Sequence, residues 1–268
     1  MSVKNRVDKA RKAYASRDEQ ASAEAHAPER IESAAQEEHG GAGSQYLGDL
    51  VYGGLDGIIT TFAVVSGVAG ASLDTGIILI MGLANLLADG FSMATGAYLS
   101  SKSEQEYYDK ERERELWEVE HFPEGERKEL YAGYRQQGYT EEETRLLVDI
   151  KSRDAQRWVD AMMIDELGLL RDERKPLLSG LATLIAFIVA GSLPMAVYLL
   201  GLLVPVAPSA AYPIALALSG SALFGLGVAK VLVTHRDPIR SGLEMLVVGG
   251  LAAGVAYVIG ALLQGLAH

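Results

Sequence analysis

Charged residues are distributed very unevenly along this chain, and that distribution constrains the fold more than any other feature. Residues 49–100 and 177–268 together carry only 3 of the 24 Lys and Arg residues and 6 of the 35 Asp and Glu residues. Uncharged blocks of this length are too long for core helices of a water-soluble domain, whereas about 20 apolar residues cross a bilayer as a helix. The distribution therefore predicts an all-α integral membrane protein.

The two apolar blocks divide into five predicted membrane-spanning helices. Their approximate bounds are 49–70, 75–100, 177–201, 212–233 and 241–265. The connections after the first and third spans contain no Lys or Arg, whereas the N-terminal segment, the central block and the turn between the last two spans all contain them. Because basic residues are retained on the cytosolic side, we expect a cytosolic N-terminus and an external C-terminus.

The same division predicts four parts of the chain. They are a flexible cytosolic tail over 1–45, two membrane helices in 46–100, a three-helix cytosolic domain over 101–176 and three membrane helices in 177–268. No proline or glycine interrupts Ala97 to His121, so the second membrane helix should continue into the cytosol. A second cytosolic helix is expected at about 124–137. A third is expected at about 140–170, starting with a Thr140–Glu143 capping box.

Composition excludes several kinds of chemistry. The chain has no cysteine, so thiolate zinc sites and iron–sulfur clusters are not available to it. Its five histidines have no metal-ligand spacing and no Walker motif occurs, so we expect neither an enzyme nor an ATP-driven pump, and no cofactor. The net charge of −11 argues against nucleic acid as a partner. No secretory signal peptide is expected, because the first apolar run begins near Leu50.

Polar side chains within the predicted spans are few, and each is a functional candidate for that reason. Asp56 lies in the first span, and Asn85, Asp89 and Met93 follow at intervals of four on one face of the second. An amide, carboxylates and a thioether suit Fe²⁺, with Mn²⁺ close behind. The carboxylates can also carry protons, since burial favours their neutral form. The alternative is that both aspartates only hydrogen-bond neighbouring helices or caps.

Carboxylates and methionines are concentrated in the central block at helical spacing. The candidate metal ligands are Glu104, Glu111, Glu115, Glu118, Glu126, Glu129, Met162, Met163 and Glu166. Spacings of three and four place such side chains beside one another, as in the carboxylate sites of helical bundles. Acidic helix faces are also common on solvated surfaces. The methionine pair on a charged helix favours a metal-binding domain over that alternative.

Three segments resemble the vacuolar iron transporter family, namely Leu55–Phe62, Gly90–Glu104 and Trp158–Leu169. The resemblance covers about residues 46–268. It implies five membrane helices, a three-helix cytosolic metal-binding domain between the second and third, and a homodimer that exchanges Fe²⁺ for protons.

Carried over by position, the resemblance implies a transport pathway through Asp56 and Met93. It also implies a cytosolic metal site formed by Glu115, Glu118, Glu126, Glu129, Met162, Met163 and Glu166. Asn85 stands where family members from vacuoles often carry a glutamate, which makes Asp89, one turn further along, the candidate for that carboxylate role.

These observations predict proton-coupled export of Fe²⁺, with Mn²⁺ as a second substrate, for iron homeostasis and detoxification. The alternative is a membrane-anchored metal-binding or sensing module without flux, which would have no use for two intramembrane aspartates. A short tail and the absence of a glycosylation sequon favour a bacterial inner membrane over a vacuolar one. Gly53–Gly57 and Gly250–Gly254 are candidate dimer contacts, unless these glycines serve packing within one subunit.

Overall fold

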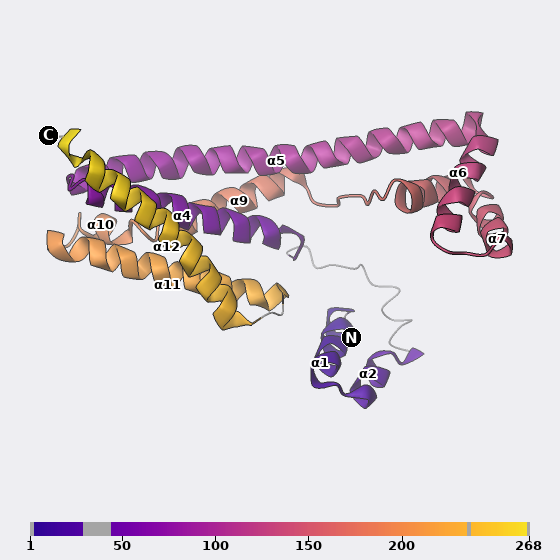
Figure 1. The fold of residues 1–268 in the computed structure, drawn as a ribbon, viewed down its shortest axis with the longest axis horizontal. Coiled ribbons are helices and arrows are strands. Elements are labelled where there is room, and N and C mark those ends of the chain that lie inside the picture. Colours follow the sequence, from indigo (N-terminus) through magenta and orange to yellow (C-terminus); the bar gives the residue numbers. More distant parts are fainter. Residues whose placement is uncertain (1–2, 29–43, 235–236, 267–268) are drawn as a thin grey trace.

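The computed structural model describes residues 3–28, 44–234 and 237–266, and all regular structure within these ranges is helical. Of the predicted tail, α1 (Val3–Ser16) and α2 (Glu19–Ala25) are helices that pack on each other, and residues 29–43 lie outside the described ranges. Beyond the tail, Figure 1 shows a bundle of helices from which α5 projects to a small domain that contains α6 and α7.

Within the described ranges, four helices are long and apolar enough to cross a membrane. They are α4 (Leu47–Gly70), α5 (Thr75–His121), α11 (Pro208–Thr234) and α12 (Pro238–Leu263). The predicted span over 177–201 is instead divided: α9 (Pro176–Gly191) has 16 residues, and a short α10 (Ala196–Leu200) follows four residues of turn. The expectation of one continuous helix was wrong there, because Pro194 has no amide hydrogen and disfavours a helical residue before it.

Helix α5 is unbroken over 47 residues, which confirms that the second predicted span continues past the apolar region. At 1.5 Å per residue it is about 70 Å long, roughly twice the apolar thickness of a bilayer. Its first half packs on α4 and α9, and its last turns reach the distal domain (Figure 1). One rigid element therefore connects the two candidate regions of the sequence.

The distal domain consists of the end of α5 with α6 (Pro123–Gln136), α7 (Glu141–Lys151), α8 (Ala155–Ala161) and a π-helical turn, Met162–Glu166. The predicted capping box is present at the start of α7. A single helix over 140–170 was wrong, because Asp154 accepts a hydrogen bond from the Arg157 amide at 2.9 Å and starts a new helix. The helical conformation ends before Gly168, whose φ is 64°.

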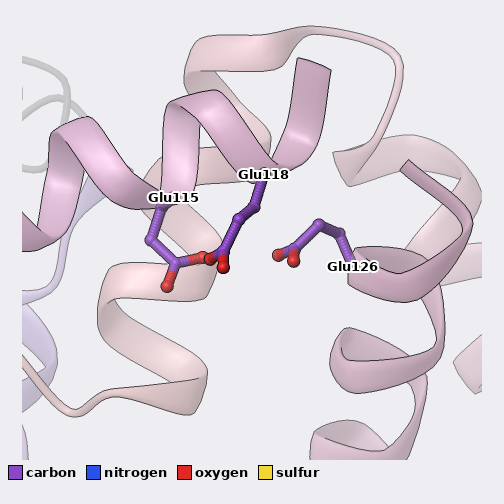
Figure 2. A group of neighbouring side chains, drawn as sticks. All are labelled: Glu115, Glu118 and Glu126. Carbon is purple, nitrogen blue, oxygen red and sulfur yellow. The ribbon is translucent and has the colours of Figure 1, made fainter. Parts of the chain in front are cut away.

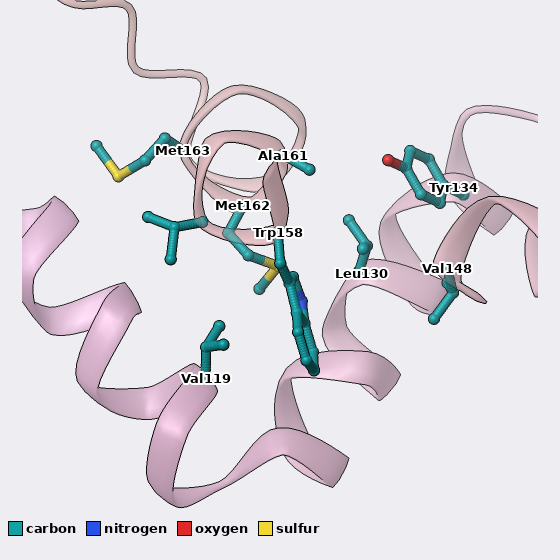
Figure 3. Packing of buried hydrophobic residues seen from close by; sticks show 9 residues of the cluster. Val119, Leu130, Tyr134, Val148, Trp158, Ala161, Met162 and Met163 are labelled. Carbon is teal, nitrogen blue, oxygen red and sulfur yellow. The ribbon is translucent and has the colours of Figure 1, made fainter. Parts of the chain in front are cut away.

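An apolar core holds the distal domain together (Figure 3). It contains Val119, Leu130, Tyr134, Val148, Trp158, Val159, Ala161, Met162 and Met163. These residues come from α5, α6, α7, α8 and the π-helical turn, so every helix of the domain contributes to one core. Large buried aromatic and thioether side chains supply much of the buried area.

Helix α4 is the centre of the membrane bundle, and glycines allow its closest contact. A Cβ atom at Gly53 would lie 2.6 Å from the Thr183 carbonyl oxygen, and one at Gly57 would lie 2.5 Å from that of Phe187. Both glycines therefore pack against α9 within the chain, as the alternative to a dimer contact predicts. Gly250 and Gly254 have no such neighbour within 4 Å in the described ranges.

Replacement of Gly57 by Ala should destabilise the bundle, because the new methyl group would collide with a backbone atom of α9. We expect a loss of about 1–3 kcal/mol in the free energy of unfolding. Circular dichroism during heating in detergent measures this loss. Gly225→Ala in α11 is the matched control, since nothing lies within 4 Å of its Cβ position. Equal melting of the two variants would contradict the close α4–α9 contact.

Candidate functional site

Three carboxylates converge where the end of α5 meets the start of α6. Glu115 and Glu118 project from α5 and Glu126 from α6 (Figure 2), and one oxygen atom from each lies within 4.8 Å of the others. The turn at Phe122, followed by Pro123 as the first residue of α6, folds the chain back so that these side chains face one another. The three form a set of oxygen ligands suitable for a divalent cation.

The cluster is short of positive charge and of hydrogen-bond donors. Glu115 is only 1% exposed and Glu126 only 4%, and one buried oxygen of each has no hydrogen-bond partner in the part of the chain that the structure describes. Burial, followed by repulsion from Glu115 and Glu129, raises the pKa of Glu126 to about 8. Burial also raises the pKa of Glu115, and partial desolvation raises that of Glu166, which lies at the edge of the cluster. Buried carboxylates of this kind need a proton or a bound cation.

Arg114 supplies one positive charge to the cluster. Its guanidinium lies 3.0 Å from Glu111 and 2.6 Å from Glu115, and it also pairs with Glu118. Glu111 thus joins the cluster through Arg114 and is not one of the three converging ligands. Sequence reasoning missed Arg114, although its spacing from Glu111 and Glu118 is that of helical ion pairs. Because the side chain is 42% exposed, these pairs contribute little to stability.

The other predicted ligands of the distal domain lie at different depths. Glu129 and Glu166 are exposed at the edge of the cluster, close enough to repel Glu126. Met162 and Met163 are fully buried in the apolar core (Figure 3). Glu104 lies elsewhere, since it pairs with Arg174 in the linker before α9, and 11 residues, about 16 Å of helix, separate it from Glu115.

A second group of candidates lies between α4 and α5. Asp56 on α4 and Asp89 on α5 are half-buried and close enough for their charges to interact. Asn85 and Met93 are half-buried on either side of Asp89 along α5, and the buried amide nitrogen of Asn85 has no acceptor among the described residues. The predicted face of α5 therefore meets the predicted aspartate of α4.

A cavity of about 400 Å³ extends from this group toward the distal domain. It is lined by Asp49, Tyr52, Asp89, Ser92, Met93, Gly96, Ala97, Ser100, Ser101, Arg174 and Thr183. Asp89 and Met93, which the sequence singled out, lie on its wall, whereas Asp56 does not. Sequence reasoning missed Asp49 and Arg174 because they lie at the boundary of a span and in a linker. The only signal was a charged residue directly beside an apolar segment.

The raised pKa of Glu126 predicts that the metal-free protein loses stability as the pH rises. The folded state holds this proton up to about pH 8, whereas the group has a pKa of 4.5 when unperturbed. Between these values the folded state binds more protons, so the free energy of unfolding decreases with increasing pH. We expect a lower melting temperature near pH 8 than near pH 5, and a weaker dependence in Glu126→Gln. Glu120→Gln, an exposed position on α5, is the control, and a melting temperature independent of pH would contradict the assignment.

Comparison with known proteins gives consistent matches. A family model described as the VIT family matches residues 47–261. The vacuolar iron transporter of Toxoplasma gondii is 38% identical, with 96% of this chain and 88% of the relative aligned. Vacuolar iron transporter 1 of Arabidopsis thaliana is 33% identical, with 85% of this chain and 90% of the relative aligned. The vacuolar iron transporter of Plasmodium falciparum is 31% identical, with 98% of each chain aligned. The matched segment includes both the membrane bundle and the distal domain.

Proposed function

The chain belongs to the VIT family, and from that membership we propose that it exports Fe²⁺ from the cytosol across a membrane in exchange for protons. The observation that carries the proposal is the arrangement on α5. One helix bears Glu115 and Glu118 at its distal end and Asp89 and Met93 within the membrane region. A metal-collecting site and a membrane pathway are thereby connected by one rigid element.

The distal cluster is proposed to collect the ion. Glu115, Glu118 and Glu126 provide carboxylate oxygens, and Glu129 and Glu166 at the edge attract cations from solution. Because buried carboxylates hold protons at neutral pH, binding of a divalent cation releases those protons. Oxygen ligands suit both Fe²⁺ and Mn²⁺, so Mn²⁺ is proposed as a second substrate.

Met162 and Met163 are proposed as soft donors that favour Fe²⁺ within this site. Both thioethers belong to the π-helical turn, a local irregularity that often accompanies functional positions. The same turn also contains Glu166. Their flexible, polarizable side chains can change position with little loss of packing.

The membrane residues are proposed to pass the ion outward and to couple it to protons. Two carboxylates at close range in an apolar region cannot both be charged at low cost, whereas one divalent cation neutralises both. Asp56 and Asp89 can therefore hold either a metal ion or protons, and exchange between these states couples the two flows. Met93 adds a soft donor one turn from Asp89, and Asp89 serves in place of a carboxylate at Asn85.

A homodimer is also proposed, because one chain leaves polar groups open to lipid. Asp89 is only half-buried, and the cavity beside it is lined by residues of α4, α5 and α9 and by Arg174 of the linker. Charged groups at this depth normally face a protein interior or a water-filled path. A second copy over the α4–α5 face would enclose the pathway, without use of the Gly53–Gly57 surface that α9 already occupies.

The alternative function is a membrane-anchored metal-binding or sensing module without flux. An anchor has no need of a polar cavity that leads from the distal side to Asp89 and Met93, so the cavity favours transport. The host membrane stays a prediction: the sequence favours a bacterial inner membrane, and the relatives above are named for the vacuole of eukaryotic organisms.

Asp89→Asn should remove proton coupling. In proteoliposomes with Fe²⁺ outside, an acidic interior should accelerate uptake by the wild-type protein. Protons from the interior would bind the carboxylates after each metal ion is released and would leave on the outer side. We expect the variant to lose this acceleration and to transport about tenfold more slowly or worse. Asp74→Asn, an exposed residue before α5, is the control. Wild-type uptake that ignores the pH gradient would contradict antiport and favour an uncoupled carrier.

Simultaneous replacement of Glu115, Glu118 and Glu126 by Gln should weaken metal binding to the distal domain. We expect the affinity for Mn²⁺, measured by calorimetry, to fall about tenfold or more, since each substitution removes a charged ligand. Transport should slow without being abolished, because the membrane pathway is intact. The matched control is Glu113→Gln with Glu120→Gln, two exposed positions on the same helix. Unchanged binding in the triple variant would contradict the site.

A further inference from the structure

Arg174 lies in the linker between the distal domain and α9, where it joins three parts of the chain at the cytosolic end of the cavity. Its guanidinium lies 3.0 Å from Asp172 in the linker, 3.3 Å from Glu104 on α5 and 3.7 Å from Asp49 on α4. Arg174 and Asp49 both line the cavity that contains Asp89 and Met93. A fixed positive charge therefore stands on the route that a cation would take into the membrane.

The linker is held in place independently of this guanidinium. The Gln105 side chain donates hydrogen bonds to the carbonyl oxygens of Asp172, at 3.0 Å, and Arg174, at 2.5 Å. The Lys175 amide donates to the Tyr46 hydroxyl at 2.9 Å, and the buried Ser101 hydroxyl donates to Asp172 at 3.1 Å. These bonds anchor the backbone to α5 and to the start of α4, so the charge of Arg174 is not needed for anchoring.

The charges at this entrance are incompletely balanced. One guanidinium faces three carboxylates, and the buried Oδ2 atom of Asp49 has no hydrogen-bond partner among the residues that the structure describes. Although burial alone would raise the pKa of Asp172, hydrogen bonds from Arg174 hold it below its usual value. Asp172 is therefore charged at neutral pH, and the three carboxylates around one guanidinium can attract a further cation.

We propose that Arg174 is the selectivity residue of the cytosolic entrance, a tethered cation that a divalent ion must displace from Asp49 and Glu104 before it reaches the cavity. The inference rests on the proposed function, since an entrance matters only if the cavity carries the ion. Coulomb attraction to carboxylates doubles with the charge of the ion. A divalent cation can therefore compete with the guanidinium, whereas Na⁺ or K⁺ competes poorly. The displaced guanidinium keeps its contact with Asp172 and stays at the entrance.

The test measures Mn²⁺ uptake into proteoliposomes against Mn²⁺ concentration, at low and high ionic strength. Arg174→Gln removes the competing charge, so the KM should fall about threefold or more at low salt and rise more steeply with salt than in the wild type. Na⁺ should then inhibit Mn²⁺ uptake at lower concentrations. Arg174→Lys keeps the charge and should restore the KM. Arg171→Gln, which removes an exposed partner of Asp109 outside the cavity, is the matched control.

A merely structural role predicts a different pattern, namely a lower kcat or less folded protein with no decrease in KM. If the wild-type protein transports Mn²⁺ in the same assay, an unchanged or raised KM in Arg174→Gln overturns the inference and leaves the proposed function standing. Absence of any divalent flux in the wild type overturns both. Asp49→Asn tests the same charge balance without a change in the linker. Its KM should rise about threefold, and an unchanged KM there also counts against the inference.

Discussion

A carboxylate that is buried away from water must bind a proton or a cation, or accept hydrogen bonds from several donors. The arrangement of polar groups in this protein follows from that constraint. The distal cluster has buried carboxyl oxygens of Glu115 and Glu126 without donors, and the membrane bundle has Asp56 beside Asp89. Protons and a divalent cation are alternative ways to neutralise each group. Sites built in this way respond to metal and to pH together, which is the property that an exchanger requires.

The length and continuity of α5 determine where these groups lie. Met93 and Glu115 are 22 residues apart, about 33 Å along one helix, and Glu104 with its Arg174 partner lies halfway between them. No flexible joint separates the distal cluster from the cavity on this helix. The distance between the distal cluster and the cavity is therefore set by the rise of a single helix.

Hydropathy and helix signals predicted much of this fold, and the features that they missed have two causes, local signals that were not weighed and long-range contacts. The unbroken α5 and the Thr140 cap follow from local rules, because each depends on residues within a few turns. The break after Gly191 and the new helix at Asp154 also had local signals, a proline and a capping aspartate. The prediction gave more weight to the apolar pattern and therefore expected continuous helices at both places. Spacing identified the face that bears Glu115 and Glu118, yet it could not show that α6 would bring Glu126 to it. The pairing of Glu104 with Arg174 joins residues 70 positions apart, and nothing in local sequence specifies it.

The contact between α5 and α6 has an apolar part and a polar part that oppose each other energetically. Val119 and Leu130 belong to the apolar core that draws the two helices together. Glu115 and Glu126, nearby on the same two helices, repel each other as soon as both are ionised. A divalent cation bound there would convert this repulsion into a shared ligand set, so the ion and the apolar core would stabilise the same helix pair. Loss of the ion would restore the repulsion between Glu115 and Glu126 while the apolar core still holds α5 and α6 together. Binding of protons or of another ion would then relieve that repulsion.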